Sequence, residues 1–141
     1  MDITTQAMTD TTFVHLKGAD GQYLYTDAEK TKPCRIQIYG PGSRAAQDAS
    51  AHASNRAMKR MQDNDGKMPA LTAEERLADQ ATDLAAITIG FDNFTYPPAV
   101  DKQGAELFKA FYADAKLGHL KDQVVKALND AGNFMPGSSG A

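Results

Sequence analysis

The fold is decided by the stretch Cys34-Arg35-Ile36-Gln37-Ile38-Tyr39-Gly40-Pro41-Gly42-Ser43. Apolar and polar side chains alternate strictly over residues 34–39, which is the period of a β-strand with one buried face. The Gly40-Pro41-Gly42 run ends this strand. Ser43 is a suitable N-cap, and after it small and apolar residues recur at the spacing of a helix. A strand that leads directly into a helix predicts a mixed α and β domain.

Two further strands are expected before this stretch. Residues 12–16 and 22–26 are rich in β-branched and aromatic side chains, and residues 18–21 between them have the glycine and aspartate composition of a turn. This pattern predicts a hairpin. Because so few strands cannot close into a barrel, we expect a small sheet with an open edge.

Two helices are expected directly after the sheet. The first runs from the Ser43 cap to Asp63, and a stripe of small and apolar residues follows it at every fourth position: Ala45, Ala49, Ala53, Ala57 and Met61. The second begins at a capping box of Thr72 and Glu75. Its expected buried stripe is Leu77, Ala81, Leu84, Thr88 and Phe91.

Two more helices complete the predicted architecture. Residues 92–103 contain Pro97 and Pro98 and predict an ordered aromatic loop. The third helix begins near Gly104, with Leu107, Phe108, Phe111 and Tyr112 on one face. The fourth begins at Leu117, with a buried stripe of Leu120, Val124, Leu128 and Ala131.

The predicted fold class is therefore α+β, with a small N-terminal antiparallel sheet of about three strands followed by about four packed α-helices. Residues 1–134 are expected to form a single domain. Residues 135–141 have the proline, glycine and serine composition of a flexible C-terminal tail.

Composition argues against several classes of partner. The 141 residues carry a net charge of −3, which gives no general attraction to nucleic acid or to anionic membranes. No stretch approaches the roughly 18 apolar residues that a membrane span needs. Cys34 is the one cysteine, and the N-terminus has acids where a secretory signal needs positive charge. The sequence predicts a protein of the cytoplasm that binds neither nucleic acid nor membrane.

No residue pattern predicts catalysis, a cofactor or a metal. His15, His52 and His119 are widely scattered, and no ligand spacing typical of zinc is present. The acid pairs 74–75 and 79/83 lie early in a predicted helix, where carboxylates favour the helix dipole. Residues 40–43 lack the lysine and the length of a phosphate loop. We therefore expect a protein that is not an enzyme and has no cofactor.

What remains is surface for binding proteins. The stripe of Ala49, Ala53 and Ala57 would let another helix approach closely. A second candidate set consists of rigid aromatic anchors beside the two prolines: Phe91, Phe94 and Tyr96. Ordinary core packing is the alternative interpretation of each set.

Several of these segments resemble the tail assembly chaperones of long-tailed, siphovirus-like bacteriophages. The similarity lies in the strand that runs into residues 38–43, the helix with residues 55–60, the capping box at residues 72–75, residues 87–91, and the end of the last helix up to Asn133-Phe134. It extends from about residue 35 to the C-terminus. Phe91 stands where the family usually has tryptophan.

The resemblance implies a chaperone in the host cytoplasm that coats the tape measure protein, keeps it soluble and recruits tail tube subunits. A homo-oligomer is compatible with that role. A structural virion component, such as a head-tail connector, tail tube or decoration protein, is the alternative, because such proteins are also small, acidic and non-catalytic. A regulatory enzyme with a dispersed site is a third, weaker alternative.

Overall fold

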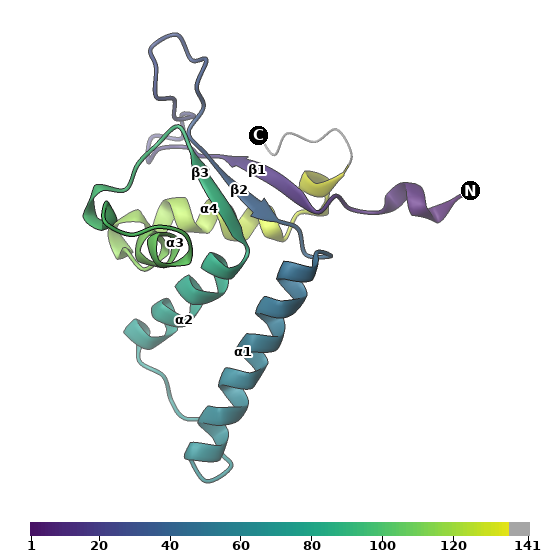
Figure 1. Cartoon of the computed structure of the whole chain (residues 1–141), viewed down its shortest axis with the longest axis vertical. Coiled ribbons are helices and arrows are strands. Elements are labelled where there is room, and N and C mark those ends of the chain that lie inside the picture. Colours follow the sequence, from purple (N-terminus) through teal and green to yellow (C-terminus); the bar gives the residue numbers. More distant parts are fainter. Residues whose placement is uncertain (136–141) are drawn as a thin grey trace.

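The computed structural model describes residues 1–135 (Figure 1). One antiparallel sheet has the strand order β1-β2-β3, with the bounds Thr11–His15, Arg35–Tyr39 and Thr88–Asp92. The helices α1 to α4 span Arg44–Asp63, Ala73–Ala86, Ala105–Tyr112 and Gly118–Leu128. Within the described residues, four short 3-10 turns, η1 to η4, cover Ile3–Gln6, Pro97–Ala99, Ala115–Leu117 and Ala131–Phe134. The predicted α+β class is confirmed.

The central strand β2 has the predicted alternation. Ile36 and Ile38 are fully buried, and in the register with β1 they lie opposite Val14 and Thr12. These side chains form the sheet face that packs on the helices, since α4 contacts β1 and α3 contacts β3. The other face carries Phe13, whose ring lies 3.8 Å from the guanidinium carbon of Arg35. Alternation in β2 thus fixes which side of the sheet is the core.

The strand predicted at residues 22–26 does not form. This segment makes only the isolated bridges Lys17↔Tyr23 and Tyr25↔Pro33. The reason is that Leu16 and Cys34, just beyond β1 and β2, already pair with each other, and the connecting chain reaches them through Leu24, whose carbonyl accepts from the N–H of Cys34 at 2.9 Å. It folds back over the end of that pair, where the N–H of Leu24 donates to the carbonyl of Leu16 at 2.9 Å.

The third strand lies instead at residues 88–92, where the sequence predicted the end of a helix. The placement of Thr88 and Phe91 on the α2 stripe is therefore wrong, because α2 ends at Ala86. The β-branched run of residues 87–89 favours extended backbone, and β2 offers its free edge to pair with. The Thr88 hydroxyl donates to the Leu84 carbonyl at 2.8 Å at this transition.

The helix starts agree with the sequence. The Ser43 hydroxyl accepts from the Ala46 N–H, and Thr72 and Glu75 form the predicted capping box. Leu84, Leu120 and Val124 are buried as expected, whereas Leu128 is only half-buried. The α4 stripe stops there, since Ala131 is exposed and begins η4.

The helix α1 extends away from the sheet (Figure 1). Only Ala49 is buried among its residues. No helix within residues 1–135 combines the length and the apolar character needed to cross a membrane. Of the predicted flexible tail, residues 136–141 lie outside the described residues, and Met135 is half-buried.

Candidate functional site

The predicted aromatic anchors come together in one cluster against α3. Phe91 leaves the end of β3 and stacks on Phe94, with ring centroids 4.7 Å apart. The ring of Phe91 also lies 5.0 Å from those of Phe108 and Phe111. Tyr96 meets Phe111 edge to face at 5.7 Å. Offset and edge-to-face pairs of this kind stabilise an aromatic cluster beyond simple burial.

A tight turn after β3 places these rings. Asn93 has a positive φ of 64°, a conformation that asparagine tolerates better than most residues. Its side-chain amide donates to the Pro33 carbonyl at 2.9 Å, and its own carbonyl accepts from the thiol of Cys34 at 3.4 Å. Pro97 and Pro98 then start η2, where their fixed φ is suited to the first helical positions. The loop is therefore ordered by hydrogen bonds at one end and by prolines at the other.

The cluster leaves an open apolar pocket of about 370 Å³. Phe91, Phe94 and Tyr96 all line it, together with Pro97, Val100, Lys102 and Leu107. Val100, at its rim, is 85% exposed. The aromatic residues are thus partly core and partly pocket wall, since Phe91, Phe94 and Tyr96 are half-buried while their neighbour Phe111 is buried.

The polar end of Tyr96 is held in place at the edge of this pocket. Its hydroxyl donates to a carboxylate oxygen of Asp114 at 2.8 Å. Burial, and secondly this hydrogen bond, raise the pKa of Tyr96 above its ordinary value. The phenol therefore stays neutral at physiological pH. The pocket is suited to receive apolar groups.

The alanine stripe lies in a different place. Ala49 belongs to the core, whereas Ala53 and Ala57 are half-buried. The helix α2 contacts both α1 and α3, and it lies between them in Figure 1. The two predicted sets therefore do not form one continuous surface.

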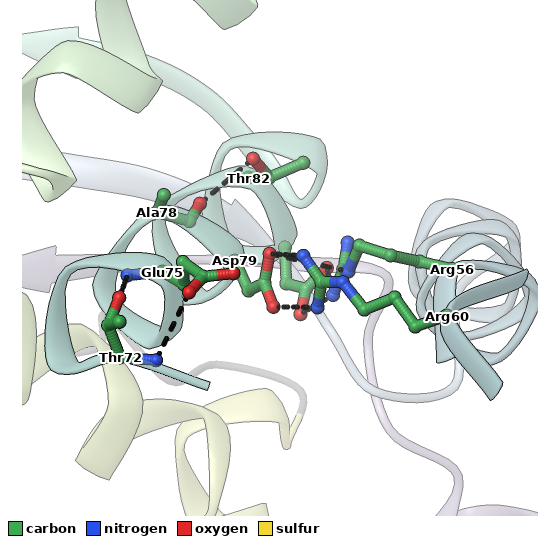
Figure 2. A network of polar contacts seen from close by, with 8 residues as sticks. Arg56, Arg60, Thr72, Glu75, Ala78, Asp79 and Thr82 are labelled. Atoms are coloured by element: carbon green, nitrogen blue, oxygen red, sulfur yellow. Dashed lines mark hydrogen bonds and ion pairs between the residues drawn. The ribbon is translucent and has the colours of Figure 1, made fainter. Parts of the chain in front are cut away.

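Two arginines on the same side of α1 hold it to α2 (Figure 2). Arg56 reaches both carboxylate oxygens of Asp83 at 2.9 and 3.0 Å, and Arg60 reaches Asp79 at 2.9 Å. The hydrogen bond from Arg60 is the largest cause of a pKa of Asp79 below its ordinary value. Arg56 and Arg60 thus neutralise the acid pair 79/83 noted in the sequence. The alanine stripe is flanked by this ion cluster.

The other polar candidates have structural positions. His15 lies on β1 and stacks on Tyr23 at 4.4 Å, while His52 and His119 are exposed and elsewhere. The hydroxyl of Ser43 donates to the Gly40 carbonyl at 2.6 Å and caps α1. Among residues 1–135 no group of three metal-ligating side chains is close enough to hold an ion.

Sequence reasoning missed the residues that complete the pocket. Val100, Lys102 and Leu107 belong to a loop and to a helix, and only the folded chain brings them beside the aromatic rings. The one signal in the sequence is Val100, an apolar residue two positions after the proline pair. Comparison of the chain with protein-family models, with curated proteins and with solved structures finds no match.

Proposed function

We propose that this chain is a tail assembly chaperone of a long-tailed bacteriophage. In this role it binds the tape measure protein in the host cytoplasm, keeps it soluble and recruits tail tube subunits, without catalysing a reaction. The observation that carries the proposal is the open aromatic pocket beside β3. It offers a preformed apolar surface at which a hydrophobic chain could be held.

The resemblance to the chaperone family is connected to this pocket. Of the segments that carry the resemblance, residues 38–43 end a strand and cap a helix, and Phe134 is fully buried. These have structural roles in the described part of the chain. Residues 87–91 differ, because this segment ends at Phe91 on the pocket wall. It is therefore the segment best placed to contact a partner.

Co-expression tests the proposal. The chain is produced together with the long, coiled-coil-rich protein expected to be encoded downstream, and the soluble and pelleted fractions of that protein are compared. We expect the tape measure protein to be soluble with this chain and pelleted without it. If it is equally soluble in both cases, the chaperone proposal is wrong.

A pair of matched variants assigns the effect to the pocket. Val100→Asp places a charge at the rim on a residue that is 85% exposed, so the fold should be kept while apolar binding is lost. Ile3→Asp makes the same chemical change at a residue that is 72% exposed on η1, away from the pocket. We expect pelleting with the first variant and solubility with the second.

Mass spectrometry of purified particles separates the chaperone from the virion alternative. A chaperone should be absent from mature particles or far below the stoichiometry of the tube protein. A structural component, such as a connector, tube or decoration protein, should be present in stoichiometric amounts. The second result would replace the proposal by the alternative.

A further inference from the structure

A second hollow along α3 shares one lining residue with the aromatic pocket. This neighbouring hollow has a volume of about 290 Å³ and is lined by Lys102, Glu106, Lys109, Ala110 and Ala113. Lys102 lines both hollows. The two are neighbours that share this side chain, and we call them together the α3 groove. Aromatic and apolar residues line most of the first hollow, whereas two lysines, one glutamate and two alanines line the second.

The dimensions and the small residues of the α3 groove favour a helix as its occupant. A volume near 370 Å³ accommodates about two large apolar side chains, since a cavity of roughly 150 Å³ holds a benzene molecule. Side chains three or four positions apart on a helix are neighbours about 5–6 Å apart, close enough to enter together. Ala110 and Ala113 leave room for a helix backbone to approach α3.

The charges of the α3 groove indicate which helix would bind. Lys102, Lys109 and Glu106 are all exposed, and none of them forms an ion pair within residues 1–135. Among the lining residues two cations therefore stand against one carboxylate, while Lys109 also lies close enough to Asp79 of α2 to lower the pKa of that carboxyl. Acidic side chains on an incoming helix would find two partners, whereas basic side chains would find one and face two like charges.

We infer that the α3 groove binds an amphipathic helix that presents two bulky apolar residues to the pocket and carboxylates to Lys102 and Lys109. The inference rests on the proposed function, for which it names the chemistry of the bound partner. It goes beyond that function because it states which segments of a long partner are held. These are acidic amphipathic segments, and basic segments are left unbound.

Selection from a displayed library of helical peptides, with one face randomised, tests this inference directly. On the full chain we expect enrichment of peptides with two large apolar residues three or four positions apart and flanking Asp or Glu. Selection on the double variant Lys102→Glu/Lys109→Glu should enrich Lys or Arg at the same flanking positions. Basic peptides enriched on the unchanged chain, or no enrichment at all, would overturn the inference.

Titration of one selected peptide then assigns the contacts. Lys102→Glu and Lys109→Glu should each weaken binding by roughly three- to tenfold, and Glu106→Gln should strengthen it by removing the competing carboxylate. Lys126→Glu, at an exposed lysine on α4, is the charge control and should have little effect. Binding that Val100→Asp leaves unchanged would show that the peptide binds elsewhere, which also contradicts the inference.

These measurements contain no phage tail protein, so they separate the two proposals. If the peptides bind as expected but co-expression shows no effect on the tape measure protein, the α3 groove stands and the proposed function fails. If the tape measure protein is kept soluble and the lysine double variant is as effective as the unchanged chain, the chaperone acts through another surface and the inference fails.

Discussion

Two threonines on the core side show how single hydroxyl groups affect this fold. Thr88 is buried, and its hydroxyl has two hydrogen-bond partners. The Thr88 hydroxyl donates its one proton to the Leu84 carbonyl at 2.8 Å. The hydroxyl of Tyr112, which also lies 2.8 Å from that of Thr88, must therefore be the donor in the second hydrogen bond. Thr12 is equally buried, yet its hydroxyl has no hydrogen-bond partner within residues 1–135. A buried polar group without a partner costs stability, whereas a satisfied one contributes a small gain.

Replacing Thr12 by valine should therefore stabilise the protein. Valine has the same branched shape and an equal preference for strands, and it removes the unpaired hydroxyl. We expect an increase in the free energy of unfolding of about 1 kcal/mol, measured by urea denaturation with an unchanged slope. Thr11→Val, at a half-buried neighbour on the same strand, is the control and should change little. A loss of stability in Thr12→Val would mean that the hydroxyl is satisfied after all.

The buried phenol of Tyr112 should give the protein a distinctive alkaline response. Burial raises the pKa of Tyr112 to about 12. The pKa of Tyr112 in the folded protein lies above its ordinary value near 10, so the neutral phenol contributes to the free energy of unfolding. This stabilisation is complete below pH 10 and is lost as the pH rises towards 12. The full loss amounts to roughly 2 to 3 kcal/mol.

The variant Tyr112→Phe tests this directly. Near pH 8 it should be less stable than the unchanged chain by about 1 kcal/mol, because a buried hydrogen bond is lost. Phenylalanine does not titrate, so the order of stabilities should reverse at about pH 11. Unfolding curves collected from pH 8 to 12 provide the measurement, and Tyr23→Phe controls for an exposed phenol. Parallel pH profiles for Tyr112→Phe and the unchanged chain would contradict the assignment.

At the scale of elements, three ion pairs join α1 to α2. Only Ala49 of α1 is buried, whereas Arg56 and Arg60 bridge to α2 through Asp79 and Asp83. The Asp79 side chain is 20% exposed, so the pairing is partly shielded from water. A helix held in this way should open locally at a lower free energy than the sheet.

Asp79→Asn should loosen α1 without unfolding the sheet. We expect a loss of about 1 kcal/mol and faster amide exchange in the part of α1 beyond Ala53, with exchange in β2 unchanged. Pairing with Arg60 lowers the pKa of Asp79 in the folded protein, so the ionised carboxylate stabilises the fold. This stabilisation is present above the ordinary pKa of a carboxyl group and is lost as the pH falls through the lowered pKa of the folded protein. The difference from the unchanged chain should therefore shrink at low pH. Equal exchange rates in α1 would refute the electrostatic attachment.

The sequence predicted those elements whose signals are local. The alternation in β2 and the caps at Ser43 and Thr72 depend on neighbouring residues, and all three were correct. The strand β3 was missed because Thr88 and Phe91 also fit the helical period of α2. Pairing with a strand far away in the sequence decided between the two conformations, and no local pattern records such pairing.

The candidate site was predicted in the same partial way. Phe91, Phe94 and Tyr96 are close in the sequence, so their clustering could be expected, and they do line one pocket. Val100 and Leu107 complete it through tertiary folding alone. Whether Ala53 and Ala57 bind a partner stays a prediction, although their arginine neighbours were not expected to pair with α2.

For the whole molecule, the segment just before β1 and the last turn, η4, meet at the edge of the core. Phe134, in η4, is fully buried, and its carbonyl accepts a hydrogen bond from the N–H of Thr9 just before β1. A Cβ atom on Gly40 would lie 2.9 Å from the Phe134 ring and 2.8 Å from the Thr9 carbonyl oxygen. Gly40 thus allows three distant segments to meet at the end of β2.

Phe134→Ala should therefore weaken the entire fold rather than one element. Removing a fully buried phenylalanine leaves a cavity between β1, α4 and the end of β2, and typically costs about 3–5 kcal/mol. Small domains have about 5–15 kcal/mol in total, so the melting temperature should fall sharply. Amide exchange should rise together in β1, β2 and α4, unlike the local change expected for Asp79→Asn. Val100→Ala, at a residue that is 85% exposed, should stay within about 0.5 kcal/mol of the unchanged chain. If Phe134→Ala melted at the same temperature as this control, η4 would be an attachment to the domain and not part of its core.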